Sequence, residues 1–412
     1  MIRTVDVLVV GAGPAGLAAA ARLAAAGAGR VEVLEREPAA GGVPRHCTRP
    51  GFGADPLGRP LNGPAYARRA VREALRAGAT LRTGVSATGW AGPLTLDVTA
   101  PTGLERIQAR AVILATGARE RPRSARLVPG TRPAGVLTTG ELQRVVERFG
   151  AGGVRAESAG PRQEAVGRRA VVVGGDPVAR GAVRTLRAAG VEVVAVVTEL
   201  PSTAVGFGRV PVLTGTIVAE LLGRGRLSGV AVRGGDGRTA VLRCDTVVFT
   251  GDWIPDHELA RARGLALAPG TRGPVTDSAF RTPEPGVFAV GNLLRGGEPA
   301  LVASAEGRAV AGPVLDRLDG RPWPSTGVPV TAVGPLRWVT PGLVGPETAP
   351  LLVRPERRLT RPVLTIAQNG VRLRRERLNG TLAPWRSIRL GARWTGGVDP
   401  TGGPVTVGAE EE

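Results

Sequence analysis

Four residues near the start of the chain have types and a spacing suited to binding a dinucleotide. Gly11, Gly13 and Gly16 form the pattern GxGxxG, and Glu35 follows at the distance at which a carboxylate binds a ribose hydroxyl pair. In this pattern the first glycine permits a tight turn, and the second lets a pyrophosphate approach the backbone. The third lets a helix lie close to its strand, and the amides at the start of that helix bind phosphate.

A second group of reactive side chains follows in the next loop. Arg45, His46 and Cys47 are consecutive, so one thiol adjoins both a base and a cation. A thiolate can act as a nucleophile after a histidine has taken its proton. Neighbouring side chains often point apart, so an inert thiol and a packed histidine stay open as the alternative. His257 and Glu298 are further acid–base candidates.

The elements that must position the first four residues are predicted by the same stretch. Residues 5–10 are apolar except for Asp6, residues 11–16 contain the glycines, an alanine-rich run follows, and residues 31–35 are again mostly apolar. A buried strand, a glycine turn, a helix and a second strand in this order are typical of a βαβ unit. We therefore expect the glycine turn at the carboxyl end of a parallel strand.

A comparable stretch lies in the middle of the chain. After an apolar segment come Gly174, Gly175 and Asp176, then a helical segment, a strand and Glu199. Asp176 replaces the middle glycine, and its carboxylate would repel a pyrophosphate. An aspartate before a proline is also a common helix start. We expect a second dinucleotide-type unit with weak or absent nicotinamide binding; if the site binds, Glu199 favours NAD over NADP.

Four stretches resemble those of the pyridine nucleotide–disulfide oxidoreductase family. They are residues 11–16 with Glu35, the Gly41-Gly42 pair, Ala-Thr-Gly at 115–117, and a segment at 286–292. The family's last motif ends in Gly-Asp, where this chain has asparagine, which can still hydrogen-bond a hydroxyl. The resemblance implies FAD at the first site and NAD(P)H at the second. The FAD-binding residues that it implies are Gly11, Gly13, Pro14, Ala15, Gly16, Glu35, Arg36, Gly42, Val85, Ala115, Thr116, Gly117, Gly291 and Asn292.

The resemblance implies an α/β fold with two Rossmann-like dinucleotide-binding domains, the FAD domain being split by the second one. From residue 321 the composition changes to short alternating segments punctuated by proline, with an Asn-Gly turn typical of a hairpin. This indicates a small C-terminal β domain. The expected boundaries are 1–125 and 255–320 for the FAD domain, 126–254 for the second domain with a linker or insertion at 150–167, and 321–412 for the β domain.

The cysteines argue against one activity of that family. Members that reduce disulfides carry two cysteines in the loop after the Gly-Gly pair, and here Cys47 stands alone, with Cys244 far away. The segments 42–53 and 61–67 also resemble flavoprotein subunits of amino-acid, opine and cyanide-forming glycine dehydrogenases, and flavoproteins encoded with glycerol-3-phosphate dehydrogenases. Those proteins lack the dithiol too, and they often work beside a second flavoprotein or a small iron–sulfur protein.

These resemblances imply a FAD-dependent oxidoreductase. A hydride would pass between a small amine, amino acid or hydroxy acid and flavin N5, the chain serving to position the cofactor. Two alternatives stay open. One is an NAD(P)H-dependent flavin reductase that feeds a partner protein, and the other is a non-catalytic flavin-binding subunit that docks through the β domain.

Composition bounds the partners and the location. The net charge is +19 and every basic side chain except the two histidines is arginine, but the arginines are scattered and no nucleic-acid motif accompanies them. No apolar run is long enough to span a membrane. No signal peptide is recognised, so we expect a cytoplasmic protein. The only histidines are His46 and His257, and no metal-ligand spacing occurs, so we expect no metal site.

Overall fold

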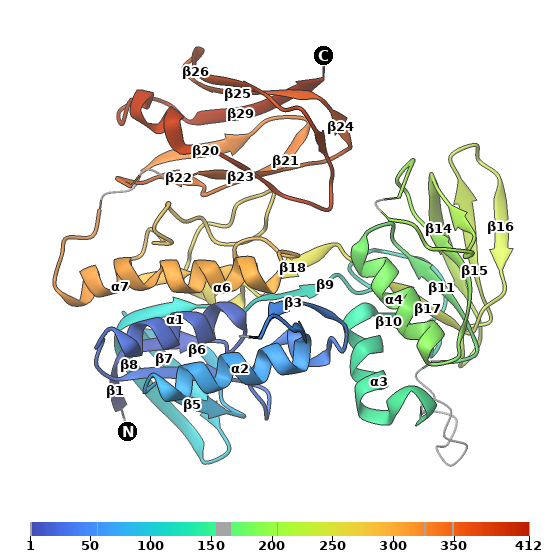
Figure 1. Cartoon of the computed structure of the whole chain (residues 1–412), viewed down its shortest axis with the longest axis horizontal. Helices are drawn as coiled ribbons and strands as arrows, with labels where there is room; N and C mark the ends of the chain where they lie inside the picture. Colours follow the sequence, from blue (N-terminus) through green and yellow to red (C-terminus); the bar gives the residue numbers. More distant parts are fainter. Residues whose placement is uncertain are drawn as a thin grey trace. The chain divides into compact units, whose positions relative to one another are not determined.

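The computed structural model of the chain forms two compact units (Figure 1). Unit 1 comprises Met1–Ala118 and Ile254–Glu412, and unit 2 comprises Arg119–Trp253. The structure describes residues 2–55, 57–153, 166–203, 205–324, 327–347 and 350–411, with only the backbone of 148–153. Of the expected linker at 150–167, residues 150–153 belong to a helix and 154–165 lie outside the described residues.

The first part of unit 1 is a parallel sheet that continues into an antiparallel meander. Its parallel strands are, in spatial order, β5 (Thr80–Thr83), β2 (Val31–Glu35), β1 (Ile2–Val10), β8 (Gly103–Leu114) and β19 (Val287–Ala289). In register, Val9 of the central strand lies between Val33 and Ile113, and all three are buried. The first half of β8 also pairs with the meander formed by β7 (Thr95–Ala100) and β6 (Ser86–Gly92).

Four helices pack on one face of this sheet. They are α1 (Pro14–Ala25), α2 (Gly63–Arg76), α6 (Ala300–Ala309) and α7 (Ala311–Leu318). The small alanine side chains of α1 let it lie close to both the sheet and α6. The sequence favours one helix over 300–318, but the structure has a break at Val310. Pro313 explains the break, because it has no N–H to bond the carbonyl four residues earlier.

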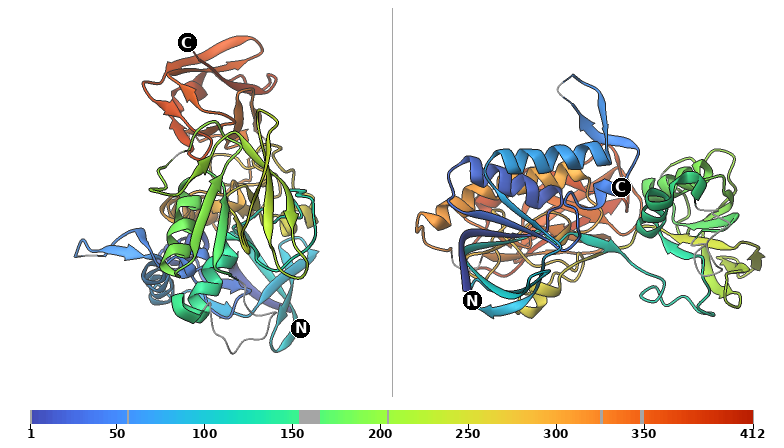
Figure 2. Two further views of the ribbon diagram at one scale, coloured as in Figure 1. Left: turned by 90° about the vertical axis from the view of Figure 1, so that its right-hand side faces the viewer. Right: turned by 90° about the horizontal axis from the view of Figure 1, so that it is seen from below.

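Shorter elements complete this part of unit 1. The hairpin of β3 (Pro50–Ala54) and β4 (Pro60–Asn62) projects from the body of the unit (Figure 2). β9 (Ala118–Glu120) and β18 (Trp253–Pro255) pair where the chain leaves and re-enters unit 1. The remaining elements are the 3₁₀ helices η1 (Val43–His46) and η2 (Gly291–Leu293) and the helix α5 (Glu258–Ala262).

Unit 2 also has a five-stranded parallel sheet, one of whose edge strands comes first in the chain, whereas the edge strand β19 of unit 1 comes last. Its parallel strands are β13 (Val212–Leu213), β12 (Glu192–Val197), β11 (Arg169–Val173), β17 (Thr246–Phe249) and β10 (Val136–Thr138). The helices α4 (Pro177–Ala188) and α3 (Thr139–Gly153) flank the sheet, and β14 (Thr216–Leu222), β15 (Gly229–Gly234) and β16 (Thr239–Leu242) form an antiparallel meander. The two Rossmann-like folds that the resemblance implies are confirmed.

The end of the chain folds as β structure with a core of its own. Buried residues from Val328 to Ala409 form one apolar cluster. One sheet has the order β22 (Leu343–Val344), β20 (Val328–Ala332), β29 (Val405–Glu411), β25 (Pro362–Gln368) and β26 (Val371–Arg377). Asn369 and Gly370 both have positive φ, as the expected hairpin turn requires. The other strands are β21 (Leu336–Thr340), β23 (Leu351–Pro355) and β28 (Ile388–Leu390), the pair β24 (Leu359–Thr360) and β27 (Thr381–Leu382), followed by the 3₁₀ helix η3 (Ala392–Gly397).

Candidate cofactor site

The glycine turn at residues 11–16, called the first elbow below, contains three glycines whose surroundings differ. Gly11 has φ +107°, and a Cβ there would lie 2.4 Å from the carbonyl oxygen of Ala115. A Cβ at Gly16 would lie 1.9 Å from the carbonyl oxygen of Gly11, which explains how closely the helix approaches the strand. A Cβ at Gly13 would meet no atom of the described residues within 4 Å. The packing therefore requires two of the glycines, while Gly13 leaves space beside the turn.

The N-terminus of α1 faces this space without a side-chain cap. Gly13 is the N-cap, and no described side chain accepts a hydrogen bond from the first turn. Pro14 stands at the first helical position, where its fixed φ suits a helix start. The helix α2 differs, because the side chain of Asn62 accepts from the amide of Ala65 at its start. Uncapped amides at the positive end of a helix are suited to binding phosphate.

Glu35 lies beside the same turn. Its carboxylate accepts hydrogen bonds from the amides of Ala12 at 3.1 Å and Glu37 at 2.9 Å. These bonds fix the carboxylate at the end of β2, next to the elbow. The side chain of Arg36 is 67% exposed, and its guanidinium lies 3.1 Å from Asp256.

The other expected binding segments meet at the elbow. Gly41 donates to the carbonyl of Ala12 at 2.8 Å, and a Cβ at Gly42 would lie 2.9 Å from the Cα of Gly13. A Cβ at Gly291 would lie 2.8 Å from that of Ala15. These contacts place the Gly41-Gly42 pair and the Gly291 turn against the first turn of α1.

The segment at 115–117 is anchored from both sides. The amide of Ala115 donates to Val10 at 2.8 Å, and the hydroxyl of Thr116 donates to the carbonyl of Asp256 at 2.7 Å. Gly117 has φ +80°, and a Cβ there would meet none of the described atoms within 4 Å. Val85 is buried and its amide donates to the carbonyl of Glu35 at 2.9 Å, so it supports the end of β2 at Glu35.

The side-chain amide of Asn292 forms hydrogen bonds through both its nitrogen and its oxygen to the backbone of a single residue. Its Nδ2 donates to the carbonyl of Glu298 at 3.3 Å, and its Oδ1 accepts from the amide of Glu298 at 3.1 Å. An aspartate could accept the second bond but, ionised, could not donate the first. The asparagine at this motif position therefore closes the loop that follows it.

These features fit a flavin dinucleotide. The open space at Gly13, the uncapped helix start and the adjacent carboxylate of Glu35 supply the groups that a pyrophosphate and a ribose need. The sequence indicated that these segments lie together, because their placement depends on local backbone geometry.

The three candidate catalytic residues lie on and just after η1, and Glu37 is the partner that connects two of them. Arg45 forms an ion pair with Glu37, and His46 Nε2 lies 4.0 Å from the same carboxylate. The thiol of Cys47 lies 3.7 Å from the carbonyl of Val43, to which it donates. Sequence reasoning missed Glu37, although an acid two residues after the ribose carboxylate was a usable signal.

The two isolated acid–base candidates lie elsewhere in unit 1. His257 Nδ1 is 2.7 Å from the carbonyl of Arg272, so this nitrogen carries the proton and the ring is tied to backbone. Glu298 is buried and accepts from Arg354 at 2.7 Å and from Ser387 at 2.8 Å. Both side chains thus have structural partners within unit 1.

The turn at residues 174–176 of unit 2, called the second elbow, differs from the first because a side chain of the turn itself binds the amides at the start of the following helix. The carboxylate of Asp176 accepts from the amide of Ala179 at 2.8 Å and caps α4, as the sequence indicated. Burial raises the pKa of Asp176, and the amide hydrogen bonds oppose that shift. Gly174 has φ +138°, and a Cβ at Gly175 would lie 3.1 Å from the hydroxyl of Thr198. Glu199, the expected ribose acid, is exposed.

Two further charged residues near this elbow escaped sequence reasoning. Arg126 donates to the carbonyls of Thr250 at 3.1 Å and Gly251 at 2.8 Å, and its guanidinium lies 5.4 Å from the ring centre of Phe249. Burial raises the pKa of Glu120 to about 7, although the amides of Gly140 and Gly251 donate to it. No motif in the sequence marks either residue, because their partners are brought together only by the fold.

Among the described residues, no group of three or more His, Cys, Asp or Glu side chains is placed to hold a metal ion. The two cysteines are both thiols, Cys47 partly exposed and Cys244 buried. None of the helices that the described residues form has the length and apolar character needed to cross a bilayer.

Known proteins resemble parts of this chain. An opine oxidase subunit of Agrobacterium tumefaciens (strain Ach5) is 39% identical over 155 residues, covering 35% of this chain and 30% of that protein. The alpha subunit of sarcosine oxidase from Rhizobium meliloti (strain 1021) is 28% identical over 268 residues, covering 63% of this chain and 25% of that protein. The chain thus spans only a small part of the length of either relative.

Solved structures share the fold. Thioredoxin reductase of T. acidophilum superposes with a TM-score of 0.60 at 23% identity, over 77% of this chain and 99% of that one. L-proline dehydrogenase of P. horikoshii gives 0.54 at 19% identity, over 77% of this chain and 57% of that one. A family model described as pyridine nucleotide-disulphide oxidoreductase matches residues 5–307. Because that match covers most of the chain, the protein belongs to the pyridine nucleotide-disulphide oxidoreductase family.

Proposed function

We propose that the first elbow binds FAD and that the chain is a flavin-dependent oxidoreductase acting on a small amine, amino acid or hydroxy acid. The observation that carries this proposal is the contrast between the two elbows. The start of α1 is uncapped and open at Gly13, whereas Asp176 caps the start of α4. Bound FAD supplies a ring that accepts a hydride, and the chain supplies binding and orientation.

The residues of unit 1 have separate tasks in this proposal. The amides at the start of α1 bind the pyrophosphate, and Glu35 binds the ribose of the adenosine half. The Gly41-Gly42 pair brings η1 to the elbow, so Arg45, His46 and Cys47 remain the candidates for contact with substrate. His46 is the candidate base, since Glu37 lies where it can orient a histidine ring.

The proposed substrate class is based on the names of related proteins and not on the shape of a binding pocket. The names opine oxidase, sarcosine oxidase and L-proline dehydrogenase all refer to oxidation of compounds with a nitrogen-bearing carbon. A hydride donor of that kind also suits a chain whose second elbow disfavours a nicotinamide dinucleotide. We therefore place amines and amino acids before NAD(P)H as electron donors.

A second candidate function is favoured by a specific observation. Both curated relatives are named as subunits, and this chain covers a small share of each. The chain would then be a flavin-binding subunit that works with a second flavoprotein or an iron–sulfur protein. In that case bound FAD is reduced by small donors only when the partner is present.

One experiment tests the proposed function and separates it from that of an NADH-dependent flavin reductase. The purified chain is examined for the visible spectrum of oxidised flavin and then titrated without oxygen, first with NADH and then with amines, amino acids and hydroxy acids. We expect bleaching with a member of the second set and slow or no bleaching with NADH. Rapid bleaching by NADH would instead identify a flavin reductase, and protein that cannot be loaded with FAD would refute the proposal.

A further inference from the structure

A row of buried charged side chains begins at the Gly291 turn of the cofactor site. Glu306 of α6 accepts a hydrogen bond from the amide of Gly291 at 3.0 Å and forms an ion pair with Arg295. The side chain of Arg295 is only 2% exposed. The backbone of the expected flavin motif is therefore tied directly to a buried ion pair.

The next carboxylate in the row joins this loop to the C-terminal β structure. Glu298 lies 3.9 Å from the Nε of Arg295 and 2.7 Å from the Nη2 of Arg354, which belongs to β23. The hydroxyl of Ser387, just before β28, donates to both oxygens of Glu298 at 2.8 and 2.9 Å. One acid thus receives partners from the loop and from two β segments.

Arg354 holds the loop by more than its charge. Its Nη1 lies 3.4 Å from the carbonyl of Gly296, to which it donates, and its guanidinium lies 4.9 Å from the ring centre of Trp338. Burial lowers the pKa of Arg354 even though Glu298 opposes the shift. The guanidinium therefore sits in a desolvated place, where its orientation is well defined.

Burying charged side chains costs desolvation free energy, which argues that this cluster serves to fix geometry rather than to add stability. Burying ion pairs usually adds little net stability compared with apolar packing, because desolvation offsets the attraction. What a buried cluster does provide is a fixed arrangement of the groups that it joins. Here those groups include the amide of Gly291 and, through the backbone of Glu298, both ends of the Asn292 side chain.

We propose that Arg354 and Ser387 are positioning residues for the cofactor site, which act through Glu298 to hold the 291–298 loop in the conformation that binds FAD. The C-terminal β structure is then part of the flavin site and not a separate module. The inference rests on the proposed FAD binding and deepens it.

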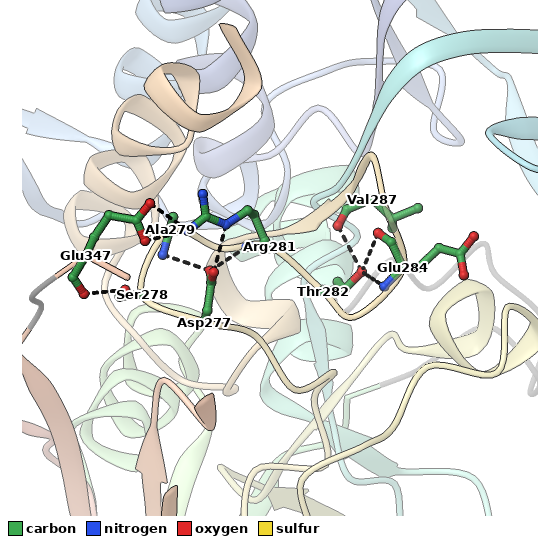
Figure 3. A network of polar contacts seen from close by, with 8 residues as sticks. All are labelled: Asp277, Ser278, Ala279, Arg281, Thr282, Glu284, Val287 and Glu347. Carbon is green, nitrogen blue, oxygen red and sulfur yellow. Dashed lines mark hydrogen bonds and ion pairs between the residues drawn. The ribbon is translucent and has the colours of Figure 1, made fainter. Parts of the chain in front are cut away.

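A second ionic cluster, which is more exposed, supplies a control. Arg281 Nε lies 2.7 Å from Asp277, and its Nη2 lies 2.6 Å from Glu347, which follows β22 (Figure 3). This cluster also joins the C-terminal part to the preceding chain, but the contacts drawn involve residues 277–287 and Glu347. Glu347→Gln therefore weakens a second arginine–carboxylate contact, in which the Glu347 side chain is 48% exposed, and the contacts drawn for it do not include residues 291–298.

The test compares full-length Arg354→Met, Arg354→Lys, Ser387→Ala and Glu347→Gln with the parent chain. The measurements are the FAD dissociation constant, by quenching of flavin fluorescence, and the hydrogen exchange of residues 291–298 without FAD. We expect Arg354→Met to weaken FAD binding at least about tenfold and to speed that exchange, with Arg354→Lys intermediate. Ser387→Ala is expected to have a smaller effect of the same sign, and Glu347→Gln no effect.

The outcomes are separable. Equal effects of Arg354→Met and Glu347→Gln on both measurements would overturn the inference, because they would indicate general loss of stability. If Arg354→Met does not fold, Ser387→Ala decides: unchanged FAD affinity and unchanged exchange at 291–298 overturn the inference. If the parent chain itself binds no FAD, the proposed function fails, while the exchange measurement still reports whether Arg354 and Ser387 hold the loop.

Discussion

The glycines of the first elbow show how a missing side chain can serve either packing or binding. Gly11 and Gly16 are required because a Cβ would collide with backbone oxygens, whereas Gly13 leaves space that no atom of the described chain uses. The sequence pattern predicted the packing at Gly11 and Gly16, since it depends on a few local dihedral angles, and the binding role of Gly13 stays a prediction. Glu37 was not predicted, because its pairing with Arg45 depends on how the loop closes.

Gly13→Ala is expected to weaken FAD binding by at least about tenfold while leaving the fold intact, since the new methyl enters open space at the phosphate position. Its φ of −83° is compatible with alanine. The matched control is Gly312→Ala in α7, whose added Cβ also meets no described atom within 4 Å. Equilibrium titration with FAD and thermal unfolding measure the two effects; equal FAD affinity in the two variants would contradict the proposal.

His46→Asn is expected to slow flavin reduction by the substrate about 100-fold, and Cys47→Ala to leave it within about threefold, because the histidine is the proposed base. The physical reason is the carboxylate of Glu37, which lies 4.0 Å from His46 Nε2, whereas the thiol of Cys47 donates to a backbone carbonyl. Stopped-flow reduction without oxygen measures both rates. A larger loss in Cys47→Ala would assign the chemistry to the thiol.

At the level of elements, the two βαβ units differ at the start of one helix. The substitution of aspartate for the middle glycine was enough to predict the cap on α4, because an N-cap needs only its own helix. The break between α6 and α7 was also readable from Pro313, although the sequence pattern favoured one helix. The contacts of Glu120 and Arg126 could not be predicted, since segments distant in sequence supply their partners.

Asp176→Gly restores the glycine pattern and frees the amides at the start of α4. We expect the NADH dissociation constant to fall at least about tenfold. The helix loses only a few tenths of a kcal/mol, because glycine is itself an acceptable N-cap. Titration of NADH fluorescence measures the affinity, with Asp176→Asn as the control that keeps a capping side chain. Unchanged affinity in the glycine variant would show that the cap is not what limits binding.

Glu120 should make the stability of the chain depend on pH. Burial raises its pKa from 4.5 to about 7, so the folded carboxyl keeps a proton that the unfolded one has lost. The contribution of the Glu120 carboxyl to the free energy of unfolding is therefore fully present below pH 4.5 and is lost as the pH rises through about 7. Glu120→Gln should reduce the fall in unfolding free energy between about pH 5 and pH 8 by roughly 2 kcal/mol. Urea unfolding at several pH values measures this.

The exposed Glu192 in β12 provides the control for that prediction. Its side chain is 63% exposed and pairs with Arg169 at the surface. Glu192→Gln is expected to leave the pH dependence unchanged, since exposed ion pairs contribute little. The same slope in the parent and in Glu120→Gln would mean that Glu120 ionises normally in the folded state.

For the whole molecule, the family and its two Rossmann-like folds were predictable, because each rests on a short glycine motif with a strand before it. The docking of the C-terminal β structure could not be predicted from the sequence. Glu298 and Arg354 are 56 positions apart, and neither sits in a motif. Their pairing is a product of tertiary packing, which apolar periodicity does not encode.

The chain as a whole should present one reactive thiol. Cys47 is partly exposed, whereas burial raises the pKa of the Cys244 thiol to about 11, with Asp245 adding to the shift. We expect a thiol reagent near neutral pH to modify one cysteine rapidly and the second only after unfolding. Cys47→Ser should abolish the rapid phase. Two rapid thiols, or none, would contradict this arrangement.

All the ion pairs described above use guanidinium groups or the imidazole of His46, and the printed sequence contains no lysine. Cross-linkers that react only with amines, which are a usual means of trapping a transient complex, therefore find no side-chain amine on this protein. A search for a partner protein needs reagents that couple through carboxylates or through the sulfur of Cys47. A failure to cross-link with amine-directed reagents would then follow from the absence of lysine and would say nothing about the quaternary structure.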